Sequence, residues 1–180
     1  MILGIKKLHE LVQKQKLVEN LCERELNNPE GAGFDLRLDE VYEIEGAGFL
    51  GLKERETPKI NLLAKNNPDS EENFYVFKPG EYYLIKTMER VNLPVSLSGI
   101  ILPRTTLFRS GLGLFNGIVQ PGYSGELTFG LSNLGKSNIK IEFGARVVHI
   151  TFHEVLGEGN EYRGQWQGGR VGTEGAEKQV

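Results

Sequence analysis

The most informative segment of this chain is Pro103-Arg104-Thr105-Thr106-Leu107-Phe108-Arg109-Ser110-Gly111-Leu112. It follows an apolar, strand-like run and gathers two guanidinium groups and two threonine hydroxyls in a turn. Arginine offers a rigid fork of donors, threonine offers a small one, and backbone N–H groups are free in a turn, so the combination suits phosphate oxygens. The alternative is an ordinary helix start, with a threonine as N-cap and the arginines in solvent. The residues of this segment alone leave both interpretations open.

Segments on both sides of it have the character of short strands. Polar and apolar residues alternate in Phe34-Asp35-Leu36-Arg37-Leu38, and later runs are rich in Val, Ile, Tyr and Phe. The predicted strands cover residues 34–38, 41–44, 75–77, 82–86, 97–102, 127–131, 139–141 and 147–152. Between them lie Lys78-Pro79-Gly80, Pro121-Gly122 and Gly144, which are typical of turns. Short strands joined by glycine-bearing turns predict an all-β domain, closed or sandwiched, and not a parallel α/β sheet.

The remaining segments predict a helix, a loop and a tail. Residues 4–18 carry apolar residues near helical spacing, with lysines and glutamines between them, and predict one short amphipathic helix. The polar run 53–73 predicts a surface loop or excursion. From Gly168 onward the chain is rich in Gly, Glu and Lys and nearly lacks apolar anchors, so we expect a flexible tail. These features predict a single domain over residues 1–167 and a tail over residues 168–180.

Composition and charge restrict the partners. The 180 residues suffice for one well-packed domain, with 39% hydrophobic and 25% charged residues. A net charge of −3 argues against a protein that coats nucleic-acid polymers, because such proteins carry a large positive excess, but it allows one small anionic ligand. No run is long and apolar enough to span a bilayer, and the N-terminus resembles no export signal. We therefore expect no membrane partner and a cytoplasmic location.

No cluster of metal-binding side chains is predicted. Cys22 is the only cysteine, so neither an intrachain disulfide nor a multi-cysteine zinc site can form. His149 and His153 point to one face of a predicted strand, but they lie roughly 13 Å apart, which is too far to share one ion. We expect no metal held by protein side chains alone.

From residue 103 onward the motifs resemble, in order, those of the dCTP deaminase/dUTPase superfamily. The segment 103–112 resembles the Arg-Ser-Ser-Leu-x-x-Arg motif of dCTP deaminases and the Arg-Ser-Gly-Leu motif of dUTPases, with threonines in place of serines. After it come segments similar to the family's Gly-x-Ile-Asp-x-Gly-aromatic-x-Gly hairpin, a strand ending in Asn, the Gly-x-x-Ile-x-Gln-Leu-x-Phe strand and the Tyr-x-Gly-Lys-Tyr-Gln-Gly lid. In this chain they are residues 117–125, 127–133, 144–152 and 162–168.

Features nearer the N-terminus resemble the dCTP deaminase branch in particular. Met1-Ile2-Leu3 precedes the predicted helix, and Gly33-Phe34-Asp35-Leu36-Arg37-Leu38 resembles the opening strand of that branch. Val91-Asn92-Leu93-Pro94 resembles the turn before the phosphate motif. With motifs in order over nearly its whole length, the chain is identified as a member of the superfamily, in its dCTP deaminase-like branch.

This resemblance implies a distorted β-jelly-roll, or β-clip, that forms a homotrimer with active sites between subunits. It implies a deoxynucleoside triphosphate as ligand, with Mg²⁺ bound through the phosphates. The implied phosphate-binding residues are Arg104, Thr105, Thr106 and Arg109, and Thr105 and Arg109 would also serve catalysis. The implied base and sugar contacts are the backbone of Asn116, Gly117 and Val119 and the ring of Tyr123; the implied lid residues are Tyr162, Gln165 and Gln167.

Both catalytic carboxylates of the family are absent. Gln120 replaces the hairpin aspartate, and an amide cannot take a proton from water near neutral pH. Gly130 replaces the glutamate that moves protons in the deaminase branch, and it opens space beneath the expected base. Gln165 and Gly169 replace a lysine and a glutamine of the lid. Glu126 lies on the same predicted strand as Gly130 but roughly 13 Å away, which makes it a poor substitute.

Three functions fit these residues. The first is an enzyme of pyrimidine deoxynucleotide metabolism that deaminates or hydrolyses a triphosphate with carboxylates supplied from elsewhere. The second is a catalytically inactive nucleotide sensor, regulator or sequesterer that uses the same pocket. The third is a structural trimer in which the motifs only stabilise turns.

Overall fold

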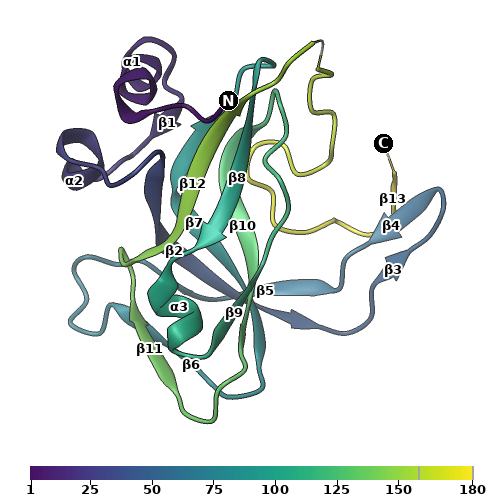
Figure 1. The fold of residues 1–180 in the computed structure, drawn as a ribbon. Helices are drawn as coiled ribbons and strands as arrows, with labels where there is room; N and C mark the ends of the chain where they lie inside the picture. Colours follow the sequence, from purple (N-terminus) through teal and green to yellow (C-terminus); the bar gives the residue numbers. More distant parts are fainter. Residues whose placement is uncertain (158, 180) are drawn as a thin grey trace.

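A computed structural model describes residues 1–157 and 159–179, and Figure 1 shows its fold. The helices of this part of the chain are short: α1 (Ile5–Gln15), α2 (Glu23–Asn27) and α3 (Thr105–Arg109). The strands are β1 (Val18–Glu19), β2 (Phe34–Glu45), β3 (Phe49–Leu50), β4 (Glu54–Glu56), β5 (Lys59–Lys65), β6 (Phe74–Phe77), β7 (Tyr82–Asn92), β8 (Leu97–Pro103), β9 (Leu112–Phe115), β10 (Ser124–Asn133), β11 (Ile139–Glu142), β12 (Arg146–Glu154) and β13 (Glu177–Lys178). The predicted all-β class is confirmed.

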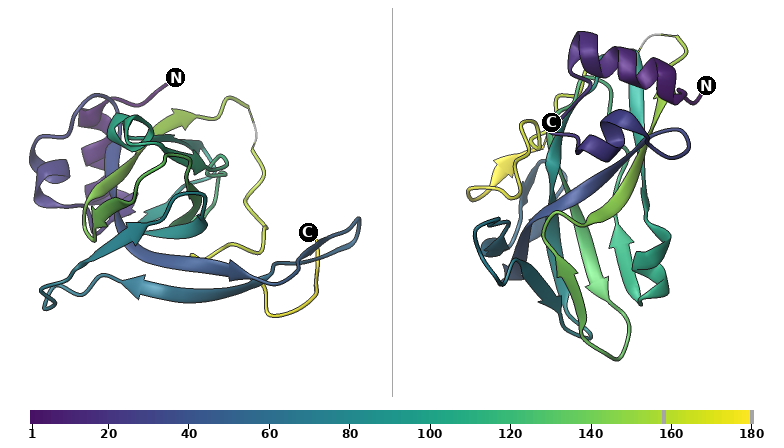
Figure 2. Two further views of the ribbon diagram at one scale, coloured as in Figure 1. Left: turned by 90° about the horizontal axis from the view of Figure 1, so that it is seen from below. Right: turned by 90° about the vertical axis from the view of Figure 1, so that its left-hand side faces the viewer.

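The largest sheet wraps around the core into a nearly closed body (Figure 2). Its antiparallel strands follow the order β8-β12-β2-β7-β10-β9, and β1 and β5 pair with β7 and β2. The first half of β2 pairs with β12 and its second half with β7 and β5. A register shift between Leu38 and Glu40 marks a bulge where β2 changes partners. This architecture confirms the distorted jelly-roll that the resemblance implies.

The core lies inside this sheet because apolar residues alternate along its strands. The buried side chains of β2 and β12 include Phe34, Leu36, Leu38, Val148, Ile150 and Phe152. The predicted amphipathic helix is confirmed as α1, which covers one end of the body and buries Leu8 and Leu11 (Figure 1). It is shorter than the predicted range 4–18, because Lys16 takes a left-handed backbone conformation that ends it and Val18 belongs to β1. Among the described residues, no helix is both long and apolar enough to cross a lipid bilayer.

The polar run 53–73 contains two strands, β4 and β5, so the prediction of a loop is wrong there. β5 pairs with β2, with Ile60 opposite Ile44. β4 pairs with β3 in a hairpin that projects from the body as an arm (Figures 1 and 2). β5 is at an edge of the main sheet and β4 belongs to the small sheet of the arm, so solvent reaches the charged side chains of both strands. The polar composition therefore indicates exposure and not the absence of a strand.

The C-terminal segment 168–179 lies along this arm, where β13 pairs with β4. Thr57 and Thr173 each donate a backbone N–H to the other's hydroxyl, at 3.0 and 2.9 Å. The structure thus gives the predicted tail defined contacts. Its flexibility in solution and the domain limits 1–167 stay predictions.

Candidate functional site

A largely apolar pocket of about 510 Å³ lies between the hairpin that follows β9, the base of the arm and the C-terminal segment. It is lined by Gly117, Val119 and Tyr123, which were predicted to contact the base or sugar, by the predicted lid residue Tyr162 and by Gln120, the altered catalytic position. Leu84 and Thr128 contribute from the neighbouring strands β7 and β10. Among the residues that the structure describes, no aspartate or glutamate lines this pocket. We call it the base pocket.

The C-terminal segment covers the base pocket of its own chain. The ring of Tyr162 packs edge-on against that of Tyr123, with centroids 5.4 Å apart. Trp166 also lines the pocket, and the guanidinium of Arg55, from the arm, lies 5.0 Å above its ring. Aromatic contacts of this kind stabilise a cover that excludes water.

The two glutamines predicted for the lid take different positions. The Gln167 side chain accepts from the Ser124 N–H at 3.0 Å and donates to the Gly122 carbonyl at 3.1 Å, so it fixes the lid to the hairpin. Gln165 donates to the Glu177 carboxylate at 2.7 Å, so it fixes the lid to β13. Gln165 does not line the base pocket.

The backbone predicted to read the base is only partly free. Both backbone groups of Val119 are bonded to Gly99 of β8, at 2.8 and 2.9 Å. The Asn116 side chain donates to a β8 carbonyl at 3.1 Å. Gly117 and Ile118 make no backbone hydrogen bond with any described residue. The free backbone groups at the pocket therefore include those of Gly117 and Ile118.

The residues predicted to bind phosphate lie elsewhere, beside a second pocket of about 380 Å³. Arg104 and Thr106 line it together with Arg146. Thr105, Thr106 and Arg109 are exposed on α3, and their side chains make no hydrogen bond or ion pair with another described residue. Hydroxyl and guanidinium donors in this condition are free to bind an anion. We call these four residues, Arg104, Thr105, Thr106 and Arg109, the α3 cluster.

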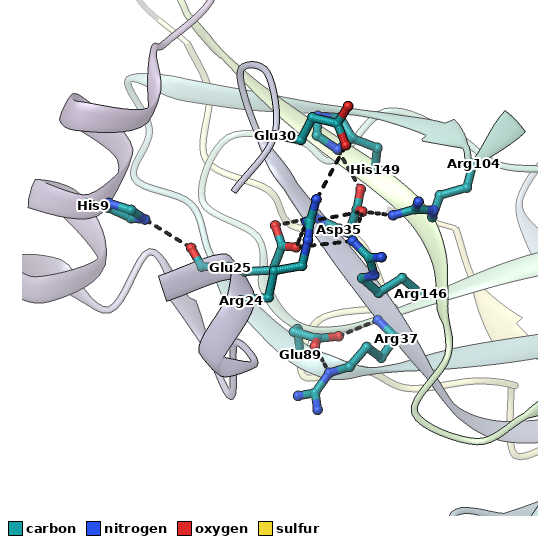
Figure 3. A network of polar contacts seen from close by, with 10 residues as sticks. All are labelled: His9, Arg24, Glu25, Glu30, Asp35, Arg37, Glu89, Arg104, Arg146 and His149. Carbon is teal, nitrogen blue, oxygen red and sulfur yellow. Dashed lines mark hydrogen bonds and ion pairs between the residues drawn. The ribbon is translucent and has the colours of Figure 1, made fainter. Parts of the chain in front are cut away.

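Arg104 belongs to a buried polar network that sequence analysis missed (Figure 3). The Asp35 carboxylate pairs with the guanidinium of Arg104 and with Arg146 Nη1 at 3.0 Å. His149 Nδ1 lies 2.8 Å from the same carboxylate. Glu25, also buried, accepts the Asp35 backbone N–H at 3.1 Å. The network fixes Arg104 at the start of α3.

The protonation state of His149 follows from its surroundings. Burial lowers the pKa of His149 below its ordinary value, so the imidazole is neutral at pH 7. Because a carboxylate only accepts hydrogen bonds, Nδ1 carries the proton and donates to Asp35.

The base pocket and the α3 cluster are not adjacent within one chain. No residue lines both pockets. Val119 pairs with Gly99, and Arg104 follows five residues later along β8, a span of roughly 16 Å. A single chain therefore presents the two halves of the predicted site at separate places.

Known proteins share this chain's sequence over most of its length. The family model for dCTP deaminase-like proteins matches residues 2–155. A dCTP deaminase of Pyrococcus furiosus is 33% identical over 159 residues, which cover 87% of this chain and 88% of that protein. A probable deoxyuridine 5'-triphosphate nucleotidohydrolase of Methanothermobacter thermautotrophicus is 33% identical over 136 residues, which cover 76% of this chain and 85% of that protein. This chain belongs to the dCTP deaminase-like family.

A solved structure supports the family's fold for this chain. The dCTP deaminase from Agrobacterium tumefaciens matches with a TM-score of 0.63 at 18% sequence identity. The match covers 84% of this chain and 48% of that protein, so the chain spans about half of its length.

The polar side chains that line the base pocket are neutral. Gln120 is exposed at the pocket wall, and its carbonyl accepts the Tyr123 N–H at 3.1 Å across the turn. Its amide oxygen can accept a hydrogen bond from water but cannot act as a general base near pH 7. The Thr128 hydroxyl is buried without a partner among the described residues. The described lining of the pocket includes no carboxylate, histidine or lysine that could serve as a general base near pH 7.

The space expected at Gly130 is filled, so the prediction of an opening there is wrong. A Cβ atom at position 130 would lie 2.8 Å from Cζ of Tyr82 and 3.1 Å from Cβ of Phe115. The Tyr82 and Phe115 rings lie 5.8 Å apart, centroid to centroid. Tyr82 was missed because its ring crosses from β7 to β10, and a single strand's sequence does not reveal its neighbour's side chains.

Glu126 does not replace the absent acid within one chain. Its carboxylate lies 3.6 Å from Arg90 Nη1 and packs against the backbone of Gly169. Thr128 lies between Glu126 and Gly130 on the same face of β10, as the strand period requires.

The side chains of the α3 cluster are not suited to hold a metal ion by themselves. Among the described residues, no three His, Cys, Asp or Glu side chains are arranged to hold one. Asp35, the carboxylate beside Arg104, is neutralised by Arg104 and Arg146. An ion carried by a nucleotide's own phosphates needs no such cage, because Mg²⁺ is commonly bound through substrate phosphates and water.

Proposed function

We propose that this protein binds a pyrimidine deoxynucleoside triphosphate, with the base and sugar in the base pocket and the phosphates bound by the α3 cluster. The observation that carries the proposal is the set of unpartnered donors exposed on α3, Thr105, Thr106 and Arg109, of which Thr106 lines the second pocket. The family membership supports a role in deoxynucleotide metabolism. Mg²⁺ would arrive with the triphosphate. Neither a membrane nor a nucleic-acid polymer is part of the proposal, and a cytoplasmic location fits it.

The separation of the two halves supports a homotrimer in which neighbouring copies complete each site. Apolar side chains are exposed along β8 and the segments next to it: Ile100 and Leu102 on β8, Phe108 on α3, and Ile118, whose neighbour Val119 pairs with Gly99 of β8. Apolar surface gathered in this way is typical of an interface between proteins. β8 is also an edge strand of the main sheet.

Leu102→Asp is expected to dissociate the trimer. Leu102 is 52% exposed, and a carboxylate there would be desolvated without a partner once the interface forms. Light scattering coupled to size-exclusion chromatography should report a mass near that of one chain instead of three. Leu52→Asp, at the exposed end of the arm, is the control and should keep the trimer mass. A wild-type protein that runs as a monomer would contradict the assembly.

Binding without turnover is the function that the geometry supports best. No acidic side chain lines the base pocket in the described chain, and Gln120 cannot act as a base. Such a protein would serve as a sensor, regulator or sequesterer of its nucleotide. The second candidate is hydrolysis or deamination with a carboxylate from a neighbouring copy, and the activities named for the two curated relatives favour it. Chromatographic product analysis after incubation with dUTP, dCTP and Mg²⁺ separates the two.

Arg109→Ala is expected to abolish stabilisation by triphosphates. A ligand at a hundred times its dissociation constant stabilises the folded state by about 2.7 kcal/mol, which corresponds to a rise in Tm of roughly 5–10 °C for a chain of this size. Thermal unfolding with dUTP, dTTP or dCTP plus Mg²⁺ measures this rise. Lys136→Ala, which removes an exposed cation outside the α3 cluster, should keep the rise in Tm. An equal rise in Arg109→Ala would remove Arg109 from the site.

A further inference from the structure

One buried carboxylate holds three guanidinium groups together beside the α3 cluster (Figure 3). Asp35 pairs with Arg104, and the same carboxylate oxygen lies 3.0 Å from Nη1 of Arg146. Nη1 of Arg24 lies 3.8 Å from that oxygen. Like charges this close repel one another unless an opposite charge lies between them. The charge of Asp35 is therefore what allows the three cations to share one place.

Arg104 depends on Asp35 more than the other two arginines do. Arg24 also pairs with Glu25, and Nη1 of Arg146 lies 3.8 Å from that second carboxylate. Among the residues that the structure describes, the Arg104 side chain forms an ion pair or hydrogen bond with Asp35 alone. If the charge of Asp35 were removed, Arg104 would be the cation left without a partner.

Arg104 keeps donors for an anion while it is paired. A planar guanidinium carries more N–H groups than one carboxylate can accept from. The Arg104 side chain is 26% exposed and lines the second pocket with Thr106. The backbone N–H of Arg104 donates to the Val147 carbonyl at 3.0 Å. The main chain is therefore fixed by β12, and the direction of the side chain is fixed by Asp35.

His149 fixes the carboxylate in turn. His149 and Asp35 lie opposite each other on β12 and β2, and Nδ1–H donates to Asp35 Oδ1 at 2.8 Å. This hydrogen bond leaves Oδ2 to face Arg104. The imidazole is closely packed, because a Cβ atom at position 33 would lie 2.6 Å from its Nε2. Glycine at position 33 therefore leaves room for the ring in this place.

We propose that Asp35 is a positioning residue for triphosphate binding, which directs the free donors of Arg104 into the second pocket, and that His149 orients the carboxylate that does so. This inference rests on the proposed function and adds to it two residues that line neither pocket. The physical gain is preorganisation. A long side chain that is held in one place before the phosphates arrive loses less conformational freedom when they bind.

Calorimetric titration of the full-length chain with dUTP and Mg²⁺ tests this role in a double-mutant cycle. Asp35→Asn keeps the size of the side chain and removes its charge, and we expect it to weaken dUTP binding roughly tenfold, the effect of one charge-assisted hydrogen bond. Arg104→Ala should weaken binding by at least as much. In the Arg104→Ala background, Asp35→Asn should change the affinity by less than about twofold, because the two residues act through one contact. Asp39→Asn, which removes a carboxylate from the same strand outside this network, should bind dUTP as wild type does.

Two substitutions of His149 test the same path without removing Asp35. His149→Ala deletes the donor to the carboxylate, and we expect it to weaken dUTP binding by roughly three- to tenfold, the effect of one hydrogen bond. His149→Asn can place an amide N–H near the position of Nδ1 and should restore most of the affinity. Urea unfolding establishes that each titrated variant is folded. If Asp35→Asn does not fold, the comparison of the two His149 variants decides the test.

The outcomes separate this role from the proposed function. Wild-type affinity in Asp35→Asn or in Arg104→Ala would overturn the positioning role while nucleotide binding stands. An equal loss of affinity from Asp35→Asn with and without Arg104, or equal affinities of the two His149 variants, would overturn it as well, because such effects do not pass through these contacts. Failure of wild type to bind dUTP would overturn the proposed function, and the role of Asp35 with it.

Discussion

We expect Asp35→Ala to lower the free energy of unfolding by about 3 kcal/mol. Asp35 is almost fully buried, and it neutralises Arg104 and Arg146 while accepting a hydrogen bond from His149 Nδ1. Removing one member of a buried ion pair costs about 3–5 kcal/mol, because it leaves the partner charges uncompensated. The lower value applies here because both arginines are about a quarter to a third exposed and regain water. Tm should fall by roughly 6–12 °C.

Asp39→Ala provides the matched control, since it removes a carboxylate from the same strand. Asp39 lies 3.8 Å from the amine of Lys65, whose side chain is 55% exposed, and pairs of that kind contribute less than about 1 kcal/mol. Thermal or urea unfolding of both variants measures the difference. Equal losses of stability in the two variants would show that the network around Asp35 carries no special weight in the fold.

The same network shows what alternation along one strand can and cannot predict. The pattern of Phe34-Asp35-Leu36-Arg37-Leu38 places the strand and its core side chains correctly. The alternation does not predict that Asp35 is buried, because Asp35 is covered by α2 and by β12, where His149 lies opposite it. Register between distant strands sets such neighbours, and the sequence of one strand does not contain it.

The candidate site repeats this division. The resemblance identifies Tyr123, Tyr162 and Gln167, and the structure brings these three together. Tyr82 and the strand character of 59–65 were missed, because both depend on partners across the sheet. The separation of the base pocket from the α3 cluster also follows only from the folded chain. What is local in sequence could be predicted, and what depends on pairing could not.

Gln120→Asp is expected to create hydrolysis of dUTP to dUMP and pyrophosphate. A positioned general base contributes about 10²–10⁴-fold to a reaction rate, so the variant should exceed wild type by at least about a hundredfold if the rest of the site is complete. Gln120 already lines the base pocket, next to the turn closed by Tyr123, so the substitution changes chemistry more than position. Chromatography of the nucleotides after incubation with Mg²⁺ measures the products.

The pocket also determines how this new activity should depend on pH. The described part of its lining holds no charged side chain, and position 120 is exposed in the free protein. The pKa of the introduced carboxylate should therefore rise above the ordinary value for aspartate once bound nucleotide shields it from water. A base works only when deprotonated, so the rate should climb with pH through that raised pKa and then level off. Gln120→Asn has the same size and no basic oxygen, and it should stay inactive at every pH. Combining Gln120→Asp with Arg109→Ala should abolish the gain, because the phosphates are then no longer held. An inactive Gln120→Asp protein that still binds dUTP would mean that the loss of catalysis involves more than one missing base.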